Sequence, residues 1–145
     1  MNQEIRLLAF LTLITLYGCF GLFDSGSKRI TDDYILVWID LQENQGIIKE
    51  WNNTGSGETI VSEYVFAVGH NDDFIIAKQH PASRFDGGYE INDKITNYYI
   101  IDINNQISED GKNVIGPLTK EKFDSFRKDL KMNAIEFDMI YPEKY

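Results

Sequence analysis

Residues 60–80 read IVSEYVFAVGHNDDFIIAKQH, and this stretch decides the fold. Two nearly continuous apolar arms, residues 60–69 and 74–80, flank a polar segment of one His, one Asn and two Asp. Asn and Asp form turns readily, because their side chains bond to the nearby backbone and tolerate unusual φ angles. The pattern therefore predicts a β-hairpin. The apolar character of both arms places this hairpin in the middle of a sheet.

Two further strands are predicted before the hairpin. Residues 34–41 carry apolar side chains at both odd and even positions, so neither face of this strand should be fully open to water. A turn at residues 43–46 follows, in which Gly46 is able to take a positive φ. Residues 46–51 then pair back as the second strand of this pair.

A helix is predicted near the carboxyl end, after the Gly-Pro-Leu segment at residues 116–118. Thr119 is a suitable N-cap, and Glu121 suits the positive end of the helix dipole. One apolar stripe follows at spacings of three and four residues, formed by Phe123, Phe126 and Leu130. The stripe is the face with which the helix should pack on the sheet.

Two more strands complete the prediction, at residues 95–103 and 135–139. In the second of these, apolar and acidic residues alternate, which is typical of an edge strand or of a cover over one sheet face. The fold class predicted is α+β, with an antiparallel β-sheet of about five or six strands, mostly a meander, and one carboxyl-terminal helix packed on it.

Residues 81–94 form the longest irregular stretch predicted for the folded part. They include Arg84, Phe85 and Tyr89, residue types that are favoured at protein contacts. These three residues form the candidate partner-binding loop. The alternative, which we favour, is a solvated loop whose aromatic side chains cap the edge of the core.

The start of the chain resembles the signal of a bacterial lipoprotein. An apolar run over residues 7–17 is too short for a stable membrane anchor but has the length of a signal-peptide core. It ends in Leu16-Tyr17-Gly18-Cys19, and Cys19 is the only cysteine in the sequence. This ending resembles a lipobox, although a small residue is usual where Tyr17 stands.

The resemblance implies three regions. Residues 1–18 would be the signal peptide that is removed. Residues 19–31 would be the lipidated Cys19 and a flexible, Gly- and Ser-containing tether. Residues 32–145 would be a single globular domain. The lipid would anchor the protein in the cell membrane or the outer membrane, facing the periplasm or the exterior. The alternative is an uncleaved membrane anchor with an ordinary apolar cysteine.

The composition limits the classes of partner. The formal net charge is −9, so nucleic acid is not expected as a partner, because its phosphates would be repelled. Contact with the membrane is expected through the lipid anchor at Cys19. No second cysteine exists for a disulfide, so stability should come from packing, for which the 13% of aromatic residues supply material.

Catalytic signatures are missing from the sequence. The two histidines, His70 and His80, lie at opposite ends of one hairpin arm, so no metal site and no cofactor is expected. Neither a Gly-x-Ser-x-Gly motif nor a second cysteine supplies a nucleophile. We therefore expect a protein that is not an enzyme. A pair of carboxylates for glycoside hydrolysis stays open, because two such groups can come from anywhere in the chain.

Four blocks occur in a recognisable order. They read DYILVWID at residues 33–40, VGHNDDFIIA at 68–77, NYYIID at 97–102 and GPLT at 116–119. Together they resemble a family of small bacterial lipoproteins of unknown function, and the likeness covers most of residues 33–132. The resemblance implies an envelope location and a compact domain, and it supplies no catalytic residues.

Three classes of function are therefore expected. The first is a membrane-tethered binding or interaction module outside the cytoplasm. A special case is an inhibitor or immunity protein whose acidic body complements a basic, envelope-acting enzyme. The second is a hydrolase acting on envelope sugar or peptide, which would need converging carboxylates in one pocket. The third is a structural component of the envelope.

Overall fold

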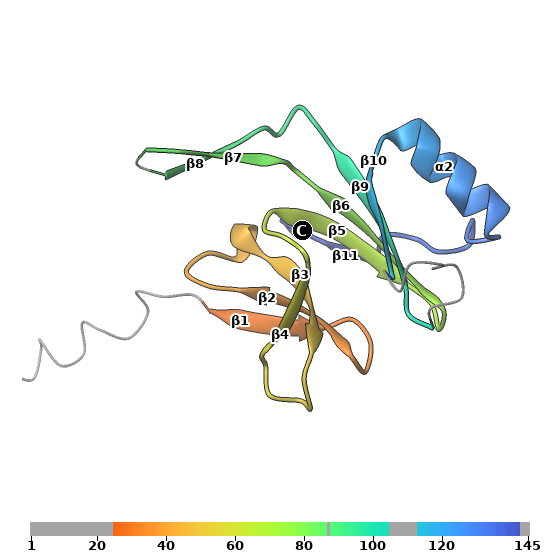
Figure 1. The fold of residues 1–145 in the computed structure, drawn as a ribbon, viewed down its shortest axis with the longest axis horizontal. Coiled ribbons are helices and arrows are strands. Elements are labelled where there is room, and N and C mark those ends of the chain that lie inside the picture. Colours follow the sequence, from red (N-terminus) through yellow and green to blue (C-terminus); the bar gives the residue numbers. More distant parts are fainter. Residues whose placement is uncertain (1–24, 87, 105–112, 143–145) are drawn as a thin grey trace, which may run out of the picture.

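The computed structural model describes residues 25–86, 88–104 and 113–142. These residues form a four-stranded sheet, a five-stranded sheet, a helix and a separate two-stranded hairpin (Figure 1). The five-stranded sheet is the middle layer, because one of its faces shares a core with the four-stranded sheet and the other shares a core with the helix. The described part of the chain contains no helix long and apolar enough to span a membrane.

The four-stranded sheet is a meander in the order β1-β2-β3-β4. Its strands are β1 (Gly26–Arg29), β2 (Tyr34–Trp38), β3 (Gly46–Glu50) and β4 (Gly57–Val61). Tyr34, Leu36 and Ile47 face the five-stranded sheet and are buried there. The opposite face is also partly closed, because Ile35 and Ile48 pair directly across the strands and are only 3% and 8% exposed. The expectation that neither face is fully open to water is confirmed.

An ion pair crosses this outer face. Arg29 of β1 and Glu50 of β3 lie on either side of β2, and their Nη2 and Oε2 atoms are 2.9 Å apart. Arg29 is the register partner of Ile35, so the pair passes beside this buried side chain. Two long charged residues thus help to cover an apolar residue that no further layer covers in the described structure.

The five-stranded sheet has the order β10-β9-β6-β5-β11. Its strands are β5 (Val65–His70), β6 (Phe74–Gln79), β9 (Asn97–Asp102), β10 (Val114–Leu118) and β11 (Met139–Ile140). The predicted hairpin is confirmed as β5 and β6, and its turn is closed by Asn71, whose Oδ1 accepts hydrogen bonds from the backbone N–H groups of Asp73 and Phe74. Its central position explains the apolar arms, since both faces of these strands are buried.

Helix α2 (Lys120–Asp129) covers the outer face of the five-stranded sheet. The hydroxyl of Thr119 accepts a hydrogen bond from the backbone N–H of Lys122, so the predicted N-cap is confirmed. Phe123 is buried, and Phe126 and Leu130 pack against the same core, as the apolar stripe predicted. Arg127 then donates to three carbonyl oxygens of the following loop, those of Met132, Asn133 and Ile135.

The α+β class, the antiparallel meander and the carboxyl-terminal helix on a sheet face are confirmed. The strands are divided between two sheets and a hairpin instead of lying in one sheet. The reason is a change of sheet inside the predicted arm 60–69. Residues 60 and 61 end β4, residues 65 onward form β5, and the crossover segment between them, residues 62–64, passes from one sheet to the other.

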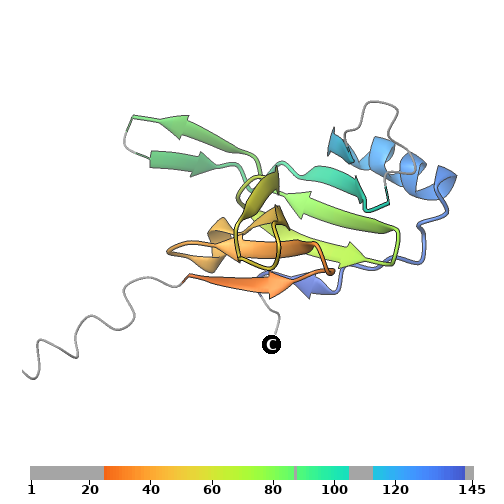
Figure 2. The same ribbon diagram turned by 60° about the horizontal axis from the view of Figure 1, so that its bottom comes forward.

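The prediction of an irregular stretch over residues 81–94 is wrong. Strands β7 (Ala82–Phe85) and β8 (Gly88–Ile91) pair as a two-stranded hairpin that projects from one end of the molecule in both views (Figures 1 and 2). The arms are only four residues long, too short for a clear periodic pattern. Phe85 is 55% exposed, so it does not cap the core edge as expected for the aromatic residues of this stretch.

Of the strand predicted over residues 135–139, only Met139 lies in a strand, because β11 is Met139–Ile140. Two other boundaries also differ from those predicted. The tether expected over residues 19–31 contains a strand, since Gly26–Arg29 pair with β2 as β1. The segment expected to lead into the helix contains another, since Val114–Leu118 pair with β9 as β10. In both cases Gly, Ser or Pro suggested loops, and hydrogen bonding to a neighbouring strand overrode that local preference.

Candidate functional site: a pocket at the end of the four-stranded sheet

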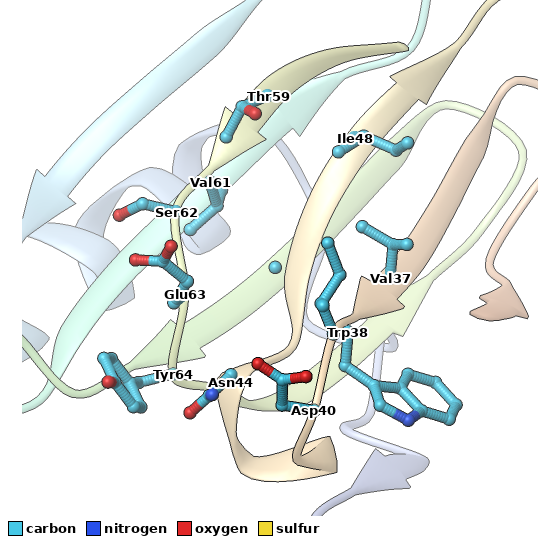
Figure 3. Close-up of a pocket in the computed structure, with 12 residues that line it drawn as sticks. Val37, Trp38, Asp40, Asn44, Ile48, Thr59, Val61, Ser62, Glu63 and Tyr64 are labelled. Carbon is cyan, nitrogen blue, oxygen red and sulfur yellow. The ribbon is translucent and has the colours of Figure 1, made fainter. Parts of the chain in front are cut away.

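A pocket of about 400 Å³ opens where β2, β3 and the crossover segment meet (Figure 3). Apolar side chains of Val37, Ile48 and Val61 form part of its wall. Polar and charged groups stand around them, and Figure 3 shows the crossover residues facing the end of β2 across the hollow. The complete lining is Val37, Trp38, Ile39, Asp40, Asn44, Gly46, Ile48, Thr59, Val61, Ser62, Glu63 and Tyr64.

Gly46 is needed where β3 approaches the end of β4. A Cβ atom at this position would lie 2.9 Å from the carbonyl oxygen of Val61, closer than real Cβ contacts. The expected reason for this glycine, a positive φ in a turn, is wrong, because Gly46 starts a strand and is not among the described glycines with positive φ. The glycine permits a close approach of the two backbones.

Two buried glutamines fix the crossover segment that forms one wall. Gln79 of β6 is 4% exposed, and its Nε2 donates to the hydroxyl and carbonyl oxygens of Ser62 and to the carbonyl oxygen of Glu63, at 2.9, 3.2 and 3.0 Å. Gln45 donates from its side chain to the carbonyl oxygen of Val65 at 2.8 Å. Because buried amides must find partners, these bonds hold the wall in one position.

Gln79 is itself oriented by β9. Its Oε1 accepts hydrogen bonds from the Tyr99 hydroxyl at 3.0 Å and from the Asn97 amide at 3.3 Å. Burial raises the pKa of Tyr99, so the phenol keeps the proton that it donates. The middle sheet therefore positions the pocket wall through one chain of hydrogen bonds, from Tyr99 through Gln79 to Ser62.

Both walls contain residues with an unfavourable backbone conformation. Asp40, just after β2, has φ of 70°, and Tyr64, at the end of the crossover segment, has φ of 68°. Five non-glycine residues of the described chain have positive φ, and these two line the same pocket. Such conformations cost roughly 1–3 kcal/mol each and persist only where the surroundings impose them. The backbone around the pocket is thus held in shape against a local preference.

The charge at the pocket is negative. Asp40 and Glu63 stand on opposite sides of the hollow, and no Lys or Arg belongs to the described lining (Figure 3). The pocket lies within an acidic segment, residues 30–77, which contains nine carboxylates and one lysine, Lys49, and so carries −8 of the formal net charge of −9. A cation that approaches the pocket is attracted by Asp40 and Glu63, and an anion is repelled by them.

Apolar side chains extend the site at its rim. Ile39 lines the pocket and is 68% exposed, and Leu41, two residues on, is 54% exposed. These two exposed side chains add apolar surface next to the hollow. The arrangement combines a partly apolar hollow, an acidic rim and an exposed apolar edge.

A second hollow is larger but less suited to a ligand. It has a volume of about 640 Å³ and is lined mainly by polar residues that include Arg29, Asp32, Asp33, Lys49 and Glu50. Charges of both signs are present, and Arg29 and Glu50 are already paired with each other. This hollow therefore lacks the single sign of charge and the apolar wall of the first pocket.

The residues predicted for function lie elsewhere. Cys19 lies outside the described residues. Arg84 and Tyr89 are opposite each other in the β7–β8 hairpin, and their side chains also lie outside the description. Phe85 is exposed on the same hairpin. Among the described residues, no group of three or more His, Cys, Asp and Glu side chains could hold a metal ion.

Sequence reasoning missed Asp40 and Glu63. These residues are 23 positions apart, and no motif connects them. One signal was present in the first arm of the predicted hairpin, where Ser62 and Glu63 interrupt an otherwise apolar run. The scarcity of lysine and arginine over residues 30–77, where Lys49 is the only one, was a second signal, because it leaves the carboxylates of that segment in excess.

Comparison with known proteins gives one match. A family model described as "Protein of unknown function (DUF3997)" matches residues 31–141, which include all of the pocket residues. No curated protein and no solved structure matches the chain.

Proposed function

As the chain belongs to the DUF3997 family of proteins of unknown function, we propose from its own residues that it is a lipid-tethered binding module that recognises a basic protein outside the cytoplasm. The observation that carries this proposal is the charge distribution. The acidic segment holds nearly all of the net charge, its Asp40 and Glu63 line the pocket beside the exposed Ile39, and no Lys or Arg belongs to the described lining. Charge of one sign at a binding site accelerates the encounter with an oppositely charged partner, and the apolar rim supplies contact area.

The proposed tether would keep this side near a membrane. Trp38 lines the pocket and packs against Gly26, the first residue of β1. Cys19 precedes Gly26 by seven residues, a length of chain that reaches at most about 25 Å. A lipid on Cys19 would therefore hold the pocket end within reach of the membrane surface, where an envelope protein could meet it. The β7–β8 hairpin, with Arg84, Phe85 and Tyr89, is proposed as a further contact.

The experiment is capture of the partner from the native envelope, followed by kinetics with the isolated pair. We expect the association rate to fall steeply between 50 and 200 mM salt, because screening weakens attraction between exposed charges. The double variant Asp40→Asn with Glu63→Gln should lose most of this dependence, whereas Asp124→Asn with Asp129→Asn on helix α2 should keep it. Salt-independent association, or equal kinetics of both double variants, would contradict the proposal.

The inhibitor or immunity protein is the special case of this function in which the partner is a basic envelope-acting enzyme. Its test is the activity of the captured partner. Addition of the wild-type protein should abolish turnover at a molar ratio near one, and the Asp40→Asn, Glu63→Gln variant should inhibit less. A partner whose activity is unchanged, or that has none, is a binding partner of another kind.

A hydrolase is the second candidate, and one observation favours it: Asp40 and Glu63 line the same pocket. Both side chains are exposed, whereas the carboxylic acids of glycosidases lie in surroundings that are partly apolar. We therefore favour recognition over catalysis. Incubation of the purified protein with envelope polysaccharide and peptide decides between them, since release of soluble fragments that is lost in Asp40→Asn and Glu63→Gln would establish the hydrolase.

A further inference from the structure

We propose that the pocket binds an alkyl chain ending in an ammonium or guanidinium group, the chemistry of a lysine or arginine side chain or of a free alkylamine. This inference rests on the proposed function and names the group that the basic partner would insert. The volume of about 400 Å³ lies in the range of ligand pockets and is sufficient for a group of this size.

The walls fit the alkyl part of such a group. Val37, Ile48 and Val61 present branched apolar side chains to the hollow. Removing the methylene groups of a lysine or arginine from water against these residues is favourable, by about 25 cal/mol for each Å² buried.

The rim fits the charged end. Asp40 and Glu63 stand on opposite sides of the hollow, so a cation between them can approach two carboxylates (Figure 3). A neutral apolar ligand would displace water from these groups without replacing its hydrogen bonds, which is unfavourable. An anion would meet two like charges. Among simple ligand chemistries, an amphipathic cation satisfies both the walls and the rim.

The site is built before the ligand arrives. Gln79 and Gln45 hold the crossover segment by buried hydrogen bonds, and the positive φ angles of Asp40 and Tyr64 show a backbone fixed by its surroundings. A preformed pocket loses little conformational entropy on binding, so a single side chain can act as the anchor of a larger interface.

The experiment uses the full chain with Trp51→Phe, which leaves Trp38 as its only tryptophan. Trp51 does not line the pocket and Trp38 does, so a change in fluorescence reports binding there. The probes are n-butylguanidine, its neutral analogue n-butylurea, and two acetylated, amidated tripeptides with arginine or neutral citrulline between glycines. Backbone NMR shifts of residues 40, 63 and 64 provide a second measurement at the same site.

We expect both cationic probes to bind and both neutral analogues to bind at least tenfold more weakly. Asp40→Asn and Glu63→Gln should each weaken binding of the cations about three- to fivefold, as expected for exposed charge pairs. Asp129→Asn removes the same charge from helix α2, outside the pocket, and should leave binding unchanged. Tighter binding of the arginine tripeptide than of n-butylguanidine identifies a protein side chain as the source, and the reverse order identifies a free amine.

Equal binding of cationic and neutral probes overturns the inference, as does unchanged binding in both pocket variants with unchanged circular dichroism. Failure of the proposed function is distinguishable from this result. If the cations bind but no basic protein associates in a salt-dependent way, the proposed function fails and the pocket assignment stands. If a basic protein associates in that way but the cations do not bind, only the pocket assignment fails.

Discussion

The side-chain amide of Gln79 donates hydrogen bonds to both the hydroxyl and the carbonyl oxygen of Ser62, at 2.9 and 3.2 Å. Gln79 belongs to the middle sheet, and Ser62 belongs to the wall of the pocket. This contact joins the most buried part of the fold to the surface proposed for recognition. The geometry of the pocket therefore depends on a residue that does not line it.

Replacing Gln79 by Met should lower both stability and binding. Met fills a similar volume but leaves the Ser62 and Glu63 carbonyl oxygens and the Tyr99 hydroxyl without their partner, which should reduce the free energy of unfolding by about 2–3 kcal/mol. Urea denaturation measures this loss. Ser62→Ala removes only one of the accepting groups and should cost about 0.5–1.5 kcal/mol. Equal stability of the Gln79→Met variant and the wild type would show that these bonds do not hold the wall.

Gly46→Ala should destabilise the protein and distort the pocket. The new methyl group meets the carbonyl oxygen of Val61, a backbone atom that cannot move without shifting β4. We expect a loss of about 1–3 kcal/mol, the usual cost of overpacking. Gly88→Ala is the matched control, because its methyl group would meet only the Phe85 ring at an ordinary contact distance of 3.6 Å. A similar melting temperature for both variants would contradict the close approach at Gly46.

Lys78 should make stability rise with pH in the alkaline range. Burial lowers the pKa of Lys78 below 10.5, and the nearby charges of Lys120 and Arg127 lower it further. Between the folded and unfolded pKa values the unfolded chain binds more protons, so the free energy of unfolding increases as pH rises toward 10.5. When unfolding by urea is measured from pH 8 to 10, the free energy of unfolding should rise more steeply with pH in the wild type than in Lys78→Met. A difference in the free energy of unfolding between the two proteins that does not change with pH would contradict this prediction.

Glu50 should make the protein less stable as the pH falls in the acidic range. The hydrogen bond from the backbone N–H of Gly55 lowers the pKa of Glu50, and Arg29 adds to this effect. The folded pKa lies below the unfolded value, so the stabilisation is present above the unfolded pKa and is lost as pH falls through the folded pKa, below 4.5. Stability measured from pH 6 to 3 should fall less steeply in Glu50→Gln. An equally steep fall in Glu50→Gln and in the wild type would contradict this prediction.

Cys19→Ala should abolish lipidation. In cells of a bacterial host supplied with radiolabelled palmitate, the wild-type protein should incorporate the label and the variant should not. Tyr17→Ala, which brings the segment before the cysteine closer to the usual lipobox, should keep the label. Mass spectrometry that finds Met1 still attached and Cys19 unmodified would remove the basis for an envelope location.

Local patterns in the sequence predicted a large part of the fold. The hairpin of β5 and β6, its Asn71 turn, the Thr119 cap and the apolar stripe of α2 all follow from residues near one another in the chain, because turn and cap chemistry and side-chain periodicity act over a few residues. The arms of the β7–β8 hairpin are too short for such patterns to identify them as strands.

The amino-acid sequence by itself determined the fold class, the central hairpin, the capped helix and the concentration of negative charge before residue 78. Only the tertiary structure decided that residues 62–64 change sheets, that Gly46 serves a close approach, and that Asp40 and Glu63 share one pocket. The physical reason is that pairing between strands depends on contacts between distant residues. Gln79 and Ser62, for example, are hydrogen-bonded although they are 17 positions apart in the sequence, and local sequence preferences do not predict such a contact.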